Sequence, residues 1–182
     1  MNELRIARIL SAVLHPFVVG PLTAALATGN WRLGAAIAAT IILPLTIVLL
    51  RRTRRGTFSD FDVSKREQRP ALYYAALPLV ALAALVVWWM DAPAAFLRSF
   101  LAIAVIFLIG LLGNRFLKIS LHMMIGTFCT VVIWRVSPAS LAATLPLLTA
   151  LAWSRWRLER HTLAEIAVGL ALGAGAALWL VF

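Results

Sequence analysis

The chain has little of three things that mark other classes of protein. Only one of its 182 residues is a cysteine, Cys129, which lies in an apolar run, so no intrachain disulfide can form. It has no long polar tract and therefore no room for a second domain, so residues 1–182 are predicted to form a single membrane-embedded domain. Internal repeats are not evident, whereas a secondary transporter is expected to show inverted repeats and broken spans.

Apolar residues are abundant instead. Hydrophobic residues make up 63% of the chain and its mean hydropathy is +0.94, whereas a soluble domain is about half apolar. Several windows of 15 to 20 residues carry no charge. These features predict an all-α polytopic membrane protein. The net charge of +10 would suggest a nucleic-acid partner in a soluble chain, but here it indicates membrane topology and contact with anionic headgroups, and we expect no nucleic acid.

Seven apolar segments are expected to form a bundle of six to seven transmembrane helices. They cover residues 9–27, 33–50, 71–90, 97–113, 119–134, 139–153 and 163–182. The fifth and sixth are short for a full crossing at about 1.5 Å per residue, which leaves the count open. His15-Pro16, inside the first segment, is typical of a kink, and a functional role for His15 is the alternative.

The basic residues are distributed unevenly between the two predicted faces. If all seven segments cross, 14 of the 17 Lys and Arg residues share the face that holds the N-terminus and the loops after the second, fourth and sixth segments. The other face holds Arg32, Arg98 and Arg135. An excess of Lys and Arg in short loops marks the cytoplasmic side. The sequence therefore predicts an integral protein of a bacterial inner membrane with cytoplasmic polar loops.

Three polar clusters fall on that basic face, each next to the start of an apolar segment. They are residues 60–70, 118–122 and 154–165. The proline of Arg69-Pro70 fits a first helical turn, which puts Arg69 at the mouth of the third segment. Helix N-termini with cationic neighbours are ready anion sites. We therefore expect a site for an anionic group at this face.

The third cluster carries the most informative chemistry. Arg155 is a cationic anchor, His161 follows six residues later, and Glu165 follows His161 by four. Positions i and i+4 share a helix face, so Glu165 can hold the imidazole in one tautomer. An oriented imidazole beside a guanidinium is suited to nucleophilic attack on a phosphate.

With this cluster, the chain resembles the type-2 phosphatidic acid phosphatase superfamily of integral lipid phosphatases. The third motif of that family is Ser-Arg, five residues, His, three residues and Asp. Here it is matched in spacing by Ser154-Arg155 and His161, with Glu165 in place of the aspartate.

The other two motifs are matched in part. The family's second motif, Pro-Ser-Gly-His, corresponds to Ile119-Ser120-Leu121-His122, which keeps the serine and the histidine. The first motif, a lysine six residues before Arg-Pro, keeps Arg69-Pro70 but has Asp62 in the lysine position. The resemblance covers residues 62–165, and the motifs occur in the family's order.

The resemblance implies a phosphohydrolase that forms a covalent phosphohistidine without a metal or other cofactor. His161 would attack phosphorus with help from Glu165, and His122 would protonate the leaving oxygen. Arg69, Ser120 and Arg155 would hold the phosphate oxygens, and Arg66 or Lys118 could supply the cation that the missing lysine leaves out. The residue types alone also suit this chemistry: one histidine can act as a nucleophile, the other as an acid, and the surrounding cations can bind the phosphate charge.

Several alternatives stay open at this point. The expected substrate is a lipid phosphate or diphosphate, such as phosphatidic acid, phosphatidylglycerol phosphate or a polyprenyl phosphate, and self-association is possible. A non-enzymatic transporter or binding protein for lipid phosphates, or a member of the family that has lost its activity, is the competing interpretation. Asp60 and Asp62 could bind a divalent cation, or pair with nearby arginines.

Overall fold

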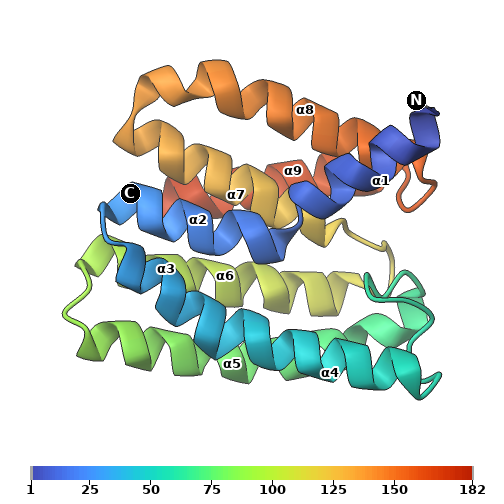
Figure 1. The fold of residues 1–182 in the computed structure, drawn as a ribbon, viewed down its shortest axis with the longest axis horizontal. Coiled ribbons are helices and arrows are strands. Elements are labelled where there is room, and N and C mark those ends of the chain that lie inside the picture. The colour runs from blue at the N-terminus through green and yellow to red at the C-terminus, as the bar shows by residue number, and fades with distance from the viewer. Residues whose placement is uncertain (1, 182) are drawn as a thin grey trace.

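The computed structural model describes residues 2–181, and all regular elements in that range are helical (Figure 1). This confirms the all-α fold. The α-helices are α1 (Glu3–Val13), α2 (Pro16–Thr28), α3 (Trp31–Ile37), α4 (Leu43–Arg54), α5 (Arg69–Trp89), α6 (Ala94–Gly113), α7 (Leu121–Val136), α8 (Leu141–Arg157) and α9 (Leu163–Ala176). The π-helical turn η1 (Ala38–Ile42) joins α3 to α4 without a break, and η4 (Ala177–Val181) continues α9.

The helices run back and forth along one axis, so the bundle has two distinct ends (Figure 1). One end, here called the polar end, holds the start of α1 and the segments 55–68, 114–120 and 158–162, which include or adjoin all three polar clusters. The other, called the far end, holds the turns at 29–30, 90–93 and 137–140. Cluster residues far apart in the sequence are thus gathered at a single end.

Fewer helices than expected are long and apolar enough to cross a membrane. Three pass by length and composition: Trp31–Arg54, Arg66–Trp89 and Ala94–Gly113. A fourth span exists if α1 and α2, which meet at a bend of 46°, are counted together. Among the described residues, two apolar helices are shorter: α7, with 16 residues, and Leu163–Trp179, which joins α9 to the start of η4. At about 1.5 Å per residue, both fall short of a bilayer core of about 30 Å. Phe182, in the seventh expected segment, lies outside the described residues.

The first expected segment, 9–27, is broken rather than continuous. His15 caps α2 through Nδ1, which accepts a hydrogen bond from the backbone N–H of Phe17 at 3.1 Å, and Pro16 is the first residue of that helix. A proline is compatible with a first helical turn but interrupts a helix that arrives from its N-terminal side. The kink predicted at His15-Pro16 is therefore present, and it turns the His15 ring toward the polar end.

Close packing of α7 against α9 fixes the start of α7. A Cβ added at Gly169 would lie 2.8 Å from the carbonyl oxygen of Ser120, and one at Gly173 would lie 2.2 Å from that of Met124. The two glycines let the backbones approach as in small-residue contacts between membrane helices. The backbone N–H of Ser120 also donates to the carbonyl of Glu165 at 3.3 Å, so the second and third clusters are joined directly.

Candidate functional site

His161 lies in the short turn between α8 and α9, with its side chain almost fully buried. Its Nδ1 is 3.1 Å from Oε2 of Glu165 and 3.1 Å from the carbonyl oxygen of Lys118. Both partners are acceptors, so Nδ1 carries the ring proton and donates it. The contact between Glu165 and His161 expected from their spacing is therefore present, and it leaves Nε2 unprotonated.

Nε2 of His161 faces a guanidinium. Nη2 of Arg69, the first residue of α5, is 3.4 Å from Nε2. The other nitrogens of the Arg69 guanidinium donate to backbone carbonyls, Nη1 to that of Ile119 and Nε to that of Val63. Arg69 is only 2% exposed, so its position is fixed by these contacts rather than by solvent. The imidazole nitrogen Nε2 of His161 therefore contacts a guanidinium whose position is fixed.

The environment of His161 keeps its ring neutral. Burial, together with the positive charges of Arg69, Arg155 and Lys118, lowers the pKa of His161 from its ordinary value to about 2. The contact with Glu165 is therefore a hydrogen bond to a neutral imidazole rather than an ion pair. At neutral pH the Nε2 lone pair is available for attack or for accepting a proton.

Glu165 is also part of the start of α9. Thr162 is the N-cap, its hydroxyl accepts from the N–H of Glu165 at 3.3 Å, and the Glu165 carboxylate accepts from the N–H of Thr162 at 3.1 Å. This reciprocal capping box fixes the carboxylate before it contacts the imidazole. The sequence therefore positions Glu165 locally, and Glu165 in turn orients His161.

Arg155, in the last turn of α8, makes a second buried charge contact. Its Nη1 donates to Oδ2 of Asp62 at 2.8 Å and to the hydroxyl of Ser11, in α1, at 2.7 Å. Its Nε is buried without a hydrogen-bond partner among the described residues. The guanidinium is thus only partly satisfied by protein atoms, which leaves a donor for an anion.

Asp62 is held by a strained loop. Val63 has φ +49° and is fully buried, an uncommon conformation for a β-branched residue. Strain of this kind persists where the surroundings enforce it and is common at functional sites. Burial would raise the pKa of Asp62, but its hydrogen bond with His15 and the nearby Arg155 charge bring the pKa well below its ordinary range. Asp62 is therefore an anion placed beside the arginine expected to bind one.

Ser120 and His122 leave polar atoms without partners at the start of α7. Ser120 is its N-cap but makes no side-chain capping bond, and its fully buried hydroxyl has no hydrogen-bond partner among the described residues. Nε2 of His122, also buried, has none either. Unsatisfied buried groups are rare and costly, so each points to a ligand or water that the side chain can bind.

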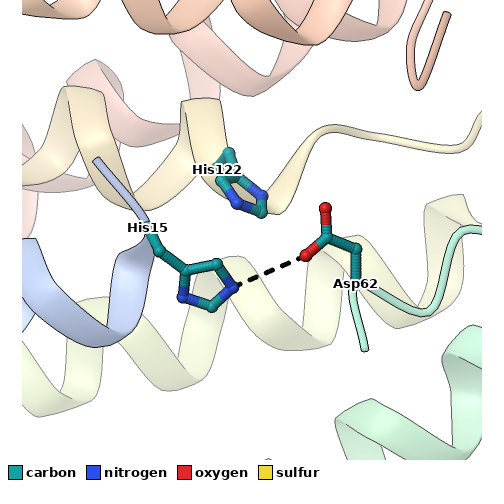
Figure 2. A group of neighbouring side chains, drawn as sticks. All are labelled: His15, Asp62 and His122. Atoms are coloured by element: carbon teal, nitrogen blue, oxygen red, sulfur yellow. Dashed lines mark ion pairs between the residues drawn. The ribbon is translucent and has the colours of Figure 1, made fainter. Parts of the chain in front are cut away.

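His122 belongs to a cluster with His15 and Asp62, in which one candidate ligand atom from each lies within 4.8 Å of the others (Figure 2). The two rings meet edge to face at 4.7 Å, and Nε2 of His15 is 3.7 Å from Oδ1 of Asp62. Such a set could hold a divalent metal. However, Nδ1 of His15 accepts from Phe17 N–H, which puts the neutral ring's proton on Nε2, and metal-bound histidines instead donate their other N–H. This tautomer points Nε2–H of His15 toward the Asp62 carboxylate and does not leave Nε2 as a ligand for a metal.

The remaining predicted residues are placed differently. Arg66 is bound to Asn114 instead of His161. Its Nε donates to the backbone carbonyl of Asn114, and Nδ2 of Asn114 donates to the backbone carbonyl of Arg66 at 3.0 Å. Lys118 contributes its backbone oxygen to His161, and burial lowers the pKa of its ammonium. Its side chain lines a pocket of about 1040 Å³ at the polar end. The other basic residues of this pocket are Arg8, Lys65, Arg157 and Arg160.

No family model, curated protein or solved structure matches this chain. The functional argument therefore depends on the residues and their geometry. The resemblance in the three motifs stays a prediction.

Two members of the site were not identified from the sequence as site residues. His15 was interpreted as part of a kink, and Asp62 as a departure from the family motif that pairs with nearby arginines. Asp62 does pair with an arginine, but with one 93 positions away. A usable signal was available, because the chain has only three histidines and all three lie at this end of the bundle.

Proposed function

We propose that this protein is a membrane phosphatase that hydrolyses a lipid phosphate or diphosphate through a phosphohistidine. One observation carries the proposal. His161 is buried and neutral, its Nδ1–H is bound by Glu165, and its unprotonated Nε2 accepts from Nη2 of the Arg69 guanidinium at 3.4 Å. A nucleophile oriented by a carboxylate and facing a cation is the arrangement that covalent phosphoryl transfer uses.

The first step transfers the phosphoryl group to the protein. Nε2 of His161 forms a bond to phosphorus as the bond from phosphorus to the leaving oxygen breaks, and His122, protonated to the imidazolium when the anionic substrate is bound, gives that oxygen a proton. The ring becomes positively charged, and Glu165 stabilises it through the Nδ1–H contact. The unpartnered Nε2 of His122 supports its role as the acid, since it is free to meet the leaving group.

The second step releases phosphate. Water attacks phosphorus, the nitrogen–phosphorus bond breaks, and His122 takes a proton from the attacking water. His161 is then neutral again with its lone pair on Nε2. No oxidant, reductant or cofactor is needed to balance either step.

Arg69, Arg155 and Ser120 would bind the phosphate oxygens. Ser120 offers an unused hydroxyl, and Arg155 an unused Nε–H. In the free protein, Nη1 of Arg155 donates a hydrogen bond to the Asp62 carboxylate. A carboxylate and a phosphate present the same kind of oxygen to a guanidinium, so the substrate would take over this contact. Asp62 would then be left to its contact with His15.

The chain would lie in a membrane with the polar end toward the cytoplasm. Three to four helices are long enough to span a bilayer. We infer that α7, α8 and α9 complete a bundle of six to seven crossings, reaching the polar end below the headgroup surface, as short spans do where the bilayer thins or the site is recessed. The basic excess at the polar end supports the orientation, and the cytoplasmic leaflet of a bacterial inner membrane would supply the lipid.

Phosphate release from a panel of lipid phosphates tests the proposal. The detergent-purified protein is compared with His161→Ala, both with a chelator present. Release by the wild type alone is expected, with the chelator having no effect. No release from any lipid, together with equal lipid binding by both proteins, would contradict the enzyme and support a binding protein, a transporter or a lapsed site.

A further inference from the structure

The cluster of His15, Asp62 and His122 opens into a narrow space on its apolar side. A pocket of about 70 Å³ is lined by these three residues, by Arg69 and by apolar side chains. On its polar side, this pocket shares His15, Phe17, Phe61 and Asp62 with the large basic pocket. Arg69 and His122, two of the residues assigned to phosphate chemistry, therefore line a pocket that adjoins both the large basic pocket and hydrocarbon side chains.

A second, larger cavity continues from it toward the far end. This cavity, of about 140 Å³, shares Pro16, Phe17, Leu45, Phe107 and Ile125 with the small pocket. Its lining runs along α2 from Pro16 to Ala27, about 17 Å of helix, and the rest comes from the helices α3 to α7. We call the two cavities together the apolar slot. The lining of the larger cavity is almost entirely hydrocarbon, and the hydroxyl of Ser99 within it is satisfied by the carbonyl of Ala95 at 3.2 Å.

We infer that the apolar slot binds the first part of the hydrocarbon chain of the substrate, and that the substrate is a phosphate or diphosphate carrying a single chain. This rests on the proposed function, which places the phosphate at Arg69 and His161. A chain attached to that phosphate would leave the site past His122 and Phe17 and enter the slot. The three cavities share lining residues and so adjoin one another, and an amphiphile with an anionic head matches both the basic and the apolar lining.

The size of the slot selects one chain over two. Pockets for drug-sized ligands hold about 300–1,000 Å³. The slot, in contrast, offers about 70 Å³ at its mouth and about 140 Å³ beyond it. A diacyl lipid would need to place two chains side by side close to the phosphate. A monoacyl or isoprenoid phosphate needs room for one, so we expect the single-chain lipid to be preferred.

Gly20 offers a way to block the slot without disturbing the protein. It lies on α2, lines the 140 Å³ cavity, and a Cβ added there meets no atom of the described residues within 4 Å. Gly20→Leu would put four carbons into the path of the chain. The change also favours the helical conformation, so folding is expected to survive. Gly20→Ala is the smaller version and is expected to have an intermediate effect.

Gly175 is the matched control. It lies in α9, a Cβ there also meets no described atom within 4 Å, and it is not among the residues that line the slot. Gly175→Leu therefore makes the same chemical change in a helix of the same protein without entering the slot. Thermal unfolding of both variants in detergent establishes that they are folded.

The experiment measures turnover and binding separately. Turnover is followed on a monoacyl phosphate, a diacyl phosphate and p-nitrophenyl phosphate, which has no chain. Binding is followed with a fluorescent monoacyl phosphate. We expect Gly20→Leu to weaken binding and to lower kcat/KM for the monoacyl phosphate at least tenfold, mainly through KM, with p-nitrophenyl phosphate and Gly175→Leu unaffected.

The outcomes distinguish the slot from the phosphatase. Equal monoacyl turnover and binding in Gly20→Leu and wild type would overturn the slot and leave the phosphatase standing. Chain binding that is lost in Gly20→Leu, but with no phosphate release by any variant, would overturn the phosphatase and keep the slot. A wild-type preference for the diacyl phosphate would overturn the single-chain assignment, and so would a folded Gly20→Leu that loses p-nitrophenyl phosphate turnover equally.

Discussion

The two ends of this bundle use polar side chains in opposite ways. At the far end, several side-chain hydrogen bonds between described residues are local: Thr28 bonds to Ala24, Ser99 to Ala95 and Thr144 to Ser140, each four positions apart. At the polar end, Arg69 meets His161 across 92 positions, and Arg155 meets Asp62 across 93 and Ser11 across 144. Local bonds satisfy hydroxyls that a helix would otherwise leave exposed to lipid. Long-range bonds between buried charges fix a geometry.

The difference indicates where function lies. Removing two guanidiniums from water carries a large desolvation penalty, and paired charges recover it only in part. A bundle selected for stability alone would place apolar residues at these positions. Buried, perturbed groups gathered in one place are instead typical of sites that bind or transform a ligand. The following predictions test the contrast between the two ends, from the largest expected effect to the smallest.

Replacing an arginine by lysine should matter at the polar end only. Arg69→Lys keeps a positive charge but loses the fork that reaches His161 and the backbone, and should lower kcat/KM about 10²- to 10³-fold. The same change at the exposed Arg98, near the far end, should leave it within about twofold. Steady-state kinetics on the best lipid phosphate measure both. An equal loss of kcat/KM in the two variants would contradict the assignment of function to the polar end.

Glu165→Gln separates orientation of the nucleophile from capping of the helix. Glutamine also serves in a capping box, so α9 should stay folded, while the weaker contact with Nδ1–H should lower kcat about 10²-fold. Thr162→Ala is the complementary control. It removes the cap, which costs about 1 kcal/mol, but leaves the carboxylate in place. Loss of activity in Thr162→Ala without loss in Glu165→Gln would contradict the assigned roles.

Breaking the buried ion pair should destabilise the fold more than breaking an exposed one. Asp62→Asn leaves Arg155 without its anion and should cost about 3 kcal/mol of unfolding free energy, much of which Arg155→Met should restore in the double variant. Glu3→Gln breaks the exposed pair with Arg157 and should cost at most about 1 kcal/mol. Denaturant unfolding in detergent provides the comparison, and equal costs would show that Asp62 is effectively solvated.

The neutral state of His161 makes stability depend on pH. Its pKa is about 2 in the folded protein and about 6.5 when unfolded, so below about pH 6.5 the unfolded chain binds a proton that the folded chain does not. Stability from this residue is therefore complete above pH 6.5 and falls by about 1.4 kcal/mol per unit as pH decreases toward the folded pKa. His161→Asn should lose this slope between pH 6.5 and 4.5. An unchanged slope would show that another group carries it.

Local patterns predicted a good part of this arrangement. The apolar runs predicted the helices, the i, i+4 spacing predicted that Glu165 contacts His161, and the proline after Arg69 predicted that this arginine begins a helix. Each of these depends on residues close in sequence. They share a helix turn or a cap, so their geometry follows from backbone periodicity.

What the sequence did not predict depends on distance along the chain. The break at His15 shortens the first expected span, and only the folded bundle brings that ring next to Asp62 and His122. Apolar length also did not predict that α7 and the helix beginning with α9 would be so short, so fewer helices than expected pass as spans by length and composition. Pairings between residues 93 or 144 positions apart have no periodic signal.

Detection of a phosphorylated His161 tests the central claim most directly. The wild-type protein is mixed with its best lipid phosphate, quenched in alkali within the first turnover, digested and analysed by mass spectrometry. The proposal predicts a phosphoryl group that is stable in alkali, labile in acid and carried by the peptide that contains His161, and none on the same peptide of His161→Ala. Phosphate release at full rate with no such adduct, or an adduct on another residue, would contradict it.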